Sequence, residues 1–133
     1  MPYTKTIKFL ITIPANQQAN SLLVGSNAQI VENELVGPVN EFVIPSTETW
    51  IIKDIYVKAS PAIDVNIKIK KNRKYMIETG PVSSLLISNP SRRKLPMLGY
   101  EPNSRLTIEA INLAAGGASA TQVEVFADVL ILP

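Results

Sequence analysis

The sequence predicts an all-β protein, an antiparallel β-sandwich, and three observations support this prediction. Hydrophobic and polar residues alternate with a period of two wherever a period is visible, which is typical of strands with one buried face. Turn-forming residues such as Gly, Pro and Asn separate these segments at short intervals. The ten prolines are spread along the 133 residues, so no stretch is left for a long helix.

Four segments alternate most regularly, and they are the strands on which the prediction depends. They are residues 7–13, 63–70, 106–110 and 123–131. Further strands are expected at residues 28–32, 41–44, 49–58, 75–78 and 82–88. About eight to ten short strands at this spacing indicate a sandwich or barrel. No shift in composition marks a second domain, so we expect one β-sandwich domain over residues 1–133.

Composition narrows the classes of function. The chain is 46% hydrophobic and 18% charged, which is typical of a globular domain and not of a disordered one. A formal net charge of +2 is too small to predict nucleic-acid binding from bulk electrostatics. The apolar runs are far shorter than the roughly 20 residues of a membrane-spanning helix. We therefore expect no membrane span and no targeting segment.

The chain contains neither His nor Cys, and this excludes specific kinds of chemistry. Ser-His-Asp and Cys-His catalytic arrangements cannot be built, and zinc and copper lose their favoured ligands. Carboxylate pairs such as Glu32 with Glu34, or Glu48 with Asp54, are interpreted as solvated surface charges. No closely spaced Asp/Asn loop suggests calcium. The sequence predicts no catalytic residue, no cofactor and no metal.

Apolar residues also occur on strand faces that should meet water. Phe126, Leu130 and Leu132 alternate out of phase with the inward set of the last strand, and Leu10 does so in the first. The strand that contains Trp50 is apolar on both faces. Such strands are either covered by a loop or buried by another subunit, and for Trp50 both interpretations stay open. A β-bulge would shift the register. We expect these five residues to form a subunit interface.

Two basic groups hold eight of the thirteen Lys and Arg residues. The first follows the polar face of the strand at 63–70 into a hairpin tip at 71–74, and the second lies in a Pro-bounded loop. If the two meet, they form a patch that can contact phosphates. The alternative is that they keep a sheet edge unpaired, since only Tyr75 offers base stacking. The patch consists of Lys68, Lys70, Lys71, Arg73, Lys74, Arg92, Arg93 and Lys94.

Two segments resemble small single jelly-roll structural proteins of virus particles. In residues 41–57 a strand ending in Ile-Pro leads through a polar turn into a strand that begins with Trp50. In residues 106–132 a strand closing on Asn112 leads through the small-residue loop 114–120 into the last strand. The two segments together make up about a third of the chain. It implies an eight-stranded jelly roll that serves as a coat, vertex or spike subunit of the virion.

The sequence therefore predicts a structural, non-enzymatic subunit that assembles with its own copies into closed homo-oligomers. Other virion proteins are expected as further partners. A ligand-binding β-sandwich, such as a carbohydrate-binding module that uses Trp50, is the alternative. A nucleic-acid-binding module that uses the basic patch is a third reading, which the net charge does not support.

Overall fold

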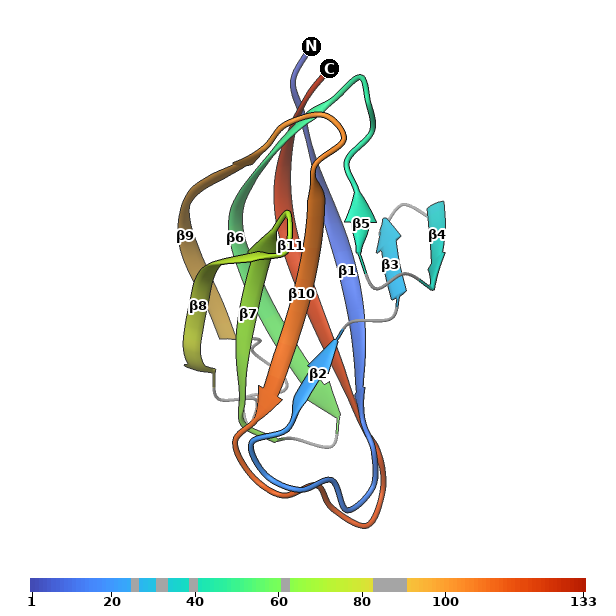
Figure 1. The fold of residues 1–133 in the computed structure, drawn as a ribbon, viewed down its shortest axis with the longest axis vertical. Coiled ribbons are helices and arrows are strands. Elements are labelled where there is room, and N and C mark those ends of the chain that lie inside the picture. Colours follow the sequence, from blue (N-terminus) through green and yellow to red (C-terminus); the bar gives the residue numbers. More distant parts are fainter. Residues whose placement is uncertain (25–26, 31–33, 39–40, 61–62, 83–90) are drawn as a thin grey trace.

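The computed structural model describes residues 1–24, 27–30, 34–38, 41–60, 63–82 and 91–133 (Figure 1). These residues form strands and turns and contain no helix. The strands are β1 (Tyr3–Ile13), β2 (Leu22–Val24), β3 (Asn27–Ile30), β4 (Glu34–Pro38), β5 (Phe42–Val43), β6 (Thr49–Ser60), β7 (Val65–Lys71), β8 (Lys74–Val82), β9 (Ser91–Tyr100), β10 (Arg105–Asn112) and β11 (Thr121–Leu132).

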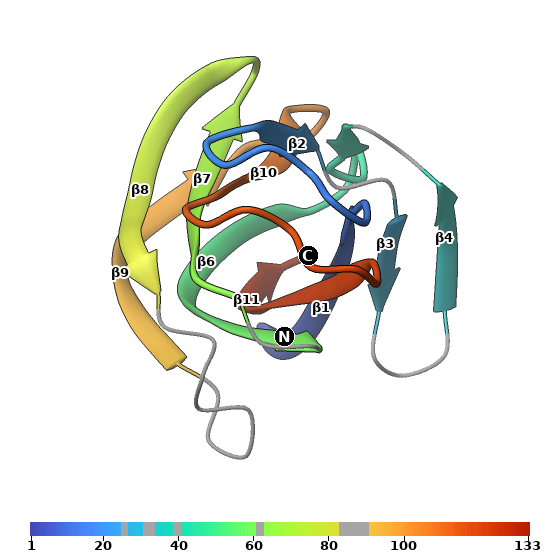
Figure 2. The same ribbon diagram turned by 90° about the horizontal axis from the view of Figure 1, so that it is seen from below.

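The strands form two antiparallel sheets that enclose the core (Figure 2). The six-stranded sheet has the order β4-β3-β1-β11-β6-β9, and the five-stranded sheet has the order β2-β10-β7-β8 with β5 paired to β10. Eight strands form nested pairs, β1 with β11, β2 with β10, β6 with β9 and β7 with β8. This is a long hairpin rolled into two sheets, which is the jelly-roll arrangement. The predicted antiparallel sandwich and its eight-stranded jelly roll are confirmed, with β3, β4 and β5 as additional short strands.

Alternation along the long strands places one set of side chains between the sheets. In β11 every second residue from Thr121 to Ile131 is buried. From the facing sheet, Val65, Ile67 and Ile69 of β7 are fully buried against them. At the edge of the six-stranded sheet, the buried Tyr100 hydroxyl donates to the backbone oxygen of Lys70 at 3.0 Å. This bond joins the two sheets, and burial raises the pKa of Tyr100 above its ordinary value.

A β-bulge in β6 corrects the expectation for Trp50. Asp54 pairs with Asp128 and Ile52 with Val129, so that Lys53 has no partner in β11. The extra residue reverses the alternation, and β6 is buried at Trp50 and Ile52 before the bulge but at Ile55 and Val57 after it. Trp50 is only 1% exposed, so the expectation that it lies at a subunit interface was wrong. The buried apolar residues before the bulge and those after it therefore pack into the same core.

Strand β9 was missed because its sequence reads as a loop. Arg92, Arg93 and Lys94 were expected in a Pro-bounded loop, but their backbone pairs with β6. Pro96 is tolerated because β9 is an edge strand, and because it lies between Lys94 and Leu98 where the register shifts. Strands β2 and β4 were also missed, and most of the expected strand at 82–88 lies outside the described residues.

The hairpin tip at residues 71–74 is confirmed. Lys71 and Lys74 form the last pair of β7 and β8, and the two residues between them both have positive φ, 51° for Asn72 and 68° for Arg73. Two such residues define the type I′ turn, whose twist suits a β-hairpin. Asn tolerates this region well, whereas a long side chain such as Arg adopts it rarely.

Two loops are fastened together at the end of the sandwich opposite the chain termini, residues 14–21 and 113–120 (Figure 1). The buried Asn112 amide donates to the backbone oxygens of Gln18 and Ala114, both at 3.0 Å, and accepts from the backbone N–H of Ser21 at 3.1 Å. The backbone of Gly116 approaches closely enough to donate to Gln17 oxygen at 2.8 Å. A Cβ on Gly116 would lie 2.9 Å from the Gln17 nitrogen and from the Pro14 oxygen.

We therefore predict that Gly116→Ala destabilises the fold by about 1–3 kcal/mol, the usual range for overpacking. The clash is with backbone atoms, which can move apart only by breaking the hydrogen bonds between the loops. The matched control is Gly117→Ala, because a Cβ there meets nothing within 4 Å. Urea unfolding of the two variants checks this, and equal midpoints would contradict the predicted close approach.

Candidate assembly surface

The outer face of the six-stranded sheet carries the remaining residues of the expected interface. Phe126, Leu130 and Leu132 occupy the outward positions of β11 and are half-buried. Leu10 occupies an outward position of β1 and is also half-buried. Because β11 lies inside the sheet, between β1 and β6, its outward side chains point to the middle of this face.

Phe126 stacks on an aromatic residue of the neighbouring strand β6. Tyr56 lies directly opposite Phe126, and the rings stack with centroids 4.9 Å apart and an interplanar angle of 9°. Lys8 lies opposite Phe126 on the other side and forms an ion pair with Glu124 at 3.5 Å. The register of β6 against β11 brings the two rings together.

Leu130 belongs to a second apolar group, at the end of the sheet near the chain termini. It lies between Thr4 of β1 and Ile51 of β6, and Leu132 follows two residues later. Leu10 is not part of this group, because it lies six residues along β1 from Thr4, about 20 Å at 3.4 Å per residue. The expected interface residues therefore share one face without forming one continuous patch.

A polar row separates the two apolar groups. Asp128 lies opposite Thr6 and opposite Asp54 of β6. The Thr6 hydroxyl donates to Asp128 at 2.9 Å, and the backbone of Lys94 lies next to Asp54 in the register. Like charges on directly opposite residues are unfavourable in a sheet. A positively charged side chain added beside this row is therefore easier to accommodate than a negatively charged one.

Trp50, the fifth expected interface residue, is held inside the sandwich. Its ring stacks on Phe42 with centroids 5.0 Å apart, and its indole N–H donates to Glu48 at 3.1 Å. This position also bears on the ligand-binding alternative, which needs an exposed aromatic platform. Trp50 cannot provide that platform while it is 1% exposed.

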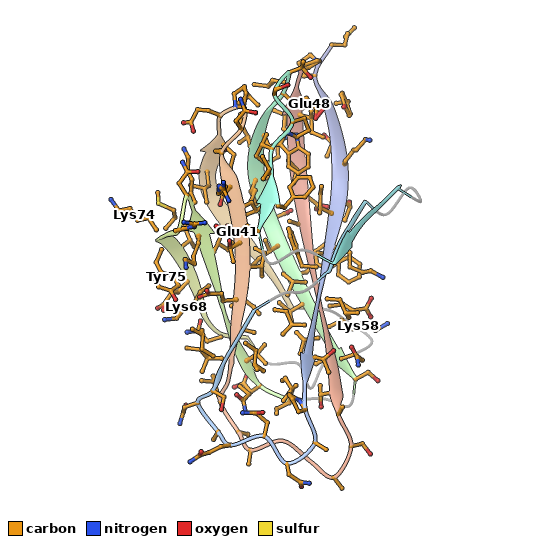
Figure 3. All side chains as sticks on the ribbon, turned by 45° about the vertical axis from the view of Figure 1, so that its right-hand side comes forward. Glu41, Glu48, Lys58, Lys68, Lys74 and Tyr75 are labelled. Atoms are coloured by element: carbon orange, nitrogen blue, oxygen red, sulfur yellow. The ribbon has the colours of Figure 1, made fainter. Side chains whose placement is uncertain are left out.

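The basic patch is divided between the two sheets. Lys68, Lys70, Lys71, Arg73 and Lys74 lie on the β7–β8 hairpin of the five-stranded sheet, where Figure 3 shows Lys68 and Lys74 beside Tyr75. Arg92, Arg93 and Lys94 lie in β9 of the six-stranded sheet, and their side chains are outside the described part of the structure.

Carboxylates neutralise most of the cations on the hairpin. Their ion pairs are Lys68 with Glu78 at 3.0 Å, Lys70 with Glu109 at 3.5 Å, Lys71 with Glu101 at 2.8 Å and Arg73 with Glu41 at 3.1 Å. Of the five hairpin cations, only Lys74 forms no ion pair within the described part of the chain. The same side chains would have to exchange these partners to bind phosphates. The structure therefore gives the nucleic-acid reading little support.

Tyr75 organises the centre of this charged face. Its hydroxyl donates to the buried carboxylate of Glu109 at 2.6 Å, which raises the pKa of Tyr75. The ammonium groups of Lys68 and Lys70 each lie 4.9 Å from the centroid of its ring. Cations over an aromatic face are attracted by its quadrupole. Sequence reasoning identified Tyr75 only as a base-stacking candidate, because Glu109 is 34 residues away in the chain.

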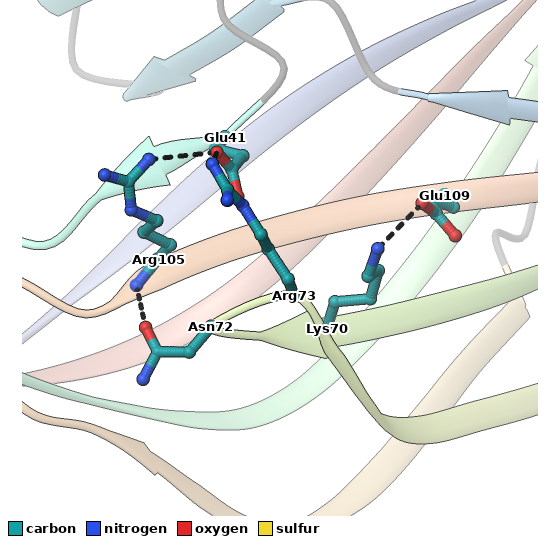
Figure 4. Close-up of polar contacts among 6 residues, drawn as sticks. All are labelled: Glu41, Lys70, Asn72, Arg73, Arg105 and Glu109. Atoms are coloured by element: carbon teal, nitrogen blue, oxygen red, sulfur yellow. Dashed lines mark hydrogen bonds and ion pairs between the residues drawn. The ribbon is translucent and has the colours of Figure 1, made fainter.

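The Glu41 carboxylate forms ion pairs with two arginines beside the turn of the hairpin, Arg73 and Arg105 (Figure 4). Arg73 donates from Nε at 3.1 Å and from Nη2 at 3.3 Å, and Arg105 donates from Nη1 at 3.0 Å. The Arg73 hydrogen bond is the chief reason that the pKa of Glu41 lies below its ordinary value.

No cluster of three acidic side chains that could hold a metal ion occurs within the described ranges. In the same part of the chain, no helix is long and apolar enough to span a membrane.

Comparison with known proteins gives a sequence match to a viral protein. The chain is 33% identical over 92 residues to the Capsid protein VP4 of Sulfolobus polyhedral virus 1, a match that covers 62% of the chain and 51% of the relative. The chain thus spans about half the length of the curated relative that it matches. No family model matches. The match confirms the resemblance to structural proteins of virus particles.

Solved structures show two weaker likenesses. The PRD1 vertex protein P5 has a TM-score of 0.44 and 13% identity, covering 91% of this chain and 95% of that one. The insecticidal delta-endotoxin Cry8Ea1 from Bacillus thuringiensis has a TM-score of 0.44 and 13% identity, covering 70% of this chain and 17% of that one. The jelly-roll assignment therefore depends on the nested strand pairs of the chain itself.

Acid should weaken the hairpin ion pairs. Hydrogen bonds from Arg73 lower the pKa of Glu41, and one from Lys71 lowers the pKa of Glu101. A carboxyl with a lower pKa in the folded state stabilises the fold above its unfolded value of about 4.5, and this stabilisation is lost as the pH falls through the folded value.

We predict that the melting temperature falls below about pH 4.5 and that Glu41→Gln flattens this dependence. The variant should be less stable than the wild type at pH 7 and should approach it at the lowest pH. Thermal melts from pH 7 to pH 3 measure the difference. Parallel curves for the two proteins at all pH values would refute the assignment to Glu41.

Proposed function

We propose that the chain is a structural subunit of a virus particle and that it works by assembly, not by catalysis. The observation that carries this proposal is the match of 33% identity over 92 residues to a viral capsid protein. The eight-stranded jelly roll supports it, because viral capsid domains are among the proteins that use this fold. The chain would then be located in the virion, with its own copies and other virion proteins as partners.

Assembly needs a surface that the fold itself does not require, and the outer face of the six-stranded sheet offers one. Leu130, Leu132 and Ile51 lie together there, outside the core. Each half-buried outward side chain that loses about 50 Å² of exposed apolar area on contact would supply roughly 1.3 kcal/mol before entropic costs. Phe126 with Tyr56 extends the same face beyond the polar row. We include Leu10 as an outlying contact.

The proposal predicts that the wild-type protein forms oligomers and that Leu130→Lys with Leu132→Lys weakens them. Lys is the better probe than Asp, because Asp128 and Asp54 lie in the neighbouring row and would repel a further carboxylate. The variant should stay folded, since neither leucine belongs to the buried core. Light scattering coupled to size-exclusion chromatography should show a smaller mass than wild type at equal concentration.

The matched control is Val43→Lys with Met76→Lys, which exchanges two exposed apolar residues of the five-stranded sheet for the same two charges. It should assemble as the wild type does. A wild-type protein that remains monomeric at millimolar concentration would sink the proposal of self-assembly. Equal masses for the wild type and the double variant would show that the face of the six-stranded sheet is not the interface.

A further inference from the structure

One end of the sandwich is uncharged, and it consists of the two loops that Asn112 fastens together, residues 14–21 and 113–120. We call it the uncharged end. The loops belong to two stretches that contain no Asp, Glu, Lys or Arg, residues 9–31 and 110–123. The surface of a small domain ordinarily carries charges of both signs interspersed over it. In the described part of the chain, the charged residues lie on the hairpin face, on the outer face of the six-stranded sheet and near the termini.

The opposite end provides the contrast within the same molecule. Glu101 lies in the turn between β9 and β10, near that end, and binds Lys71, whereas Glu41, which binds Arg73 and Arg105, lies nearer the middle of the long axis (Figure 3). Figure 3 places Glu48 near that end as well. Both chain termini also lie at that end (Figure 1). The uncharged end therefore differs in charge from the rest of the described surface.

The side chains at the uncharged end can contact protein without a large entropic cost. Exposed residues include Ala15, Ala115 and Ala118, which lose no rotamer freedom when they are buried. Asn16 and Gln18 are exposed amides, and an amide carries both a donor and an acceptor. The loops are already fixed by hydrogen bonds between their backbones and to Asn112. Contact would therefore order little that is not ordered in the single chain.

The chemistry of this end selects its occupant. Nucleic acid needs cations for its phosphates, and none is present. Charged proteins would find no complementary charge. A symmetric contact brings a surface close to its own copy, where like charges repel and where amides can pair with amides. A surface without charges meets its own copy without repulsion.

We infer that the uncharged end meets the same end of other copies of this chain around a symmetry axis. The inference depends on the proposed self-assembly and names a second contact for it, separate from the face of the six-stranded sheet. Asp64 adjoins this end through its backbone oxygen, which accepts from Leu113 at 3.0 Å, and its Oδ1 is buried.

The test introduces charge at Ala118, which is exposed in the 113–120 loop. Ala118→Asp and Ala118→Lys should each raise the apparent dissociation constant of the oligomer at least tenfold, because each places like charges around the axis. An equimolar mixture of the two variants should recover assembly, since opposite charges then alternate. Sedimentation velocity across a concentration series gives the constants, and thermal melts verify that both variants fold.

Met76→Asp is the control, an exposed residue of β8 in the five-stranded sheet, away from both proposed contacts, and it should assemble as the wild type does. Wild-type assembly by both Ala118 variants would overturn the inference while leaving the proposed function intact. Loss of assembly that the mixture does not recover would overturn the like-to-like contact. A wild type that never assembles would instead overturn the proposed self-assembly.

Discussion

The pairing of β11 with β1 and β6 is the constraint on which the rest of the structure depends. β11 is hydrogen-bonded to both neighbours along its length, from Thr121 to Leu132. A slip by one residue would turn its buried set outward and its outer set into the core. The register therefore determines the core and the outer face together. Phe126, Leu130 and Leu132 are outside because Val125, Val129 and Ile131 are inside.

This constraint explains which parts of the fold the sequence could predict. β1, β7 and β11 alternate in burial because each has one face on the core, and β10 alternates in sequence although Thr107 and Glu109 on its other face are also buried. The strand type of all four was evident from the residues alone. β6 was harder, because the bulge at Lys53 exists only against its partners β11 and β9. Because this bulge reverses the alternation of buried residues in β6, Trp50 lies in the core and not at the expected interface. β9 contains Pro96 and three basic residues, and only its place at the sheet edge makes it a strand.

Charge shows the same dependence on partners that are distant in the chain. The cations at 68–74 form a run in the sequence, which suggests a positive surface. In the folded chain Glu41, Glu101 and Glu109 reach them from other strands and loops. Each of these carboxylates is about 30 or more residues away from its partner. A cluster of like charges in sequence therefore says little about the net field until the topology brings in the opposite charges.

Assembly and folding depend on different residues of this chain, because the jelly roll places the two sets on opposite faces of its strands. Core residues and outward residues alternate on one strand, so an outer side chain can change with little effect on the packing between the sheets. The loop end differs, because Asn112 and Gly116 stabilise the connection between loops and at the same time shape the surface that these loops present. The sheet face can therefore vary in sequence with the partner. The loop end must keep its backbone geometry, and only its exposed side chains are free to tune contact.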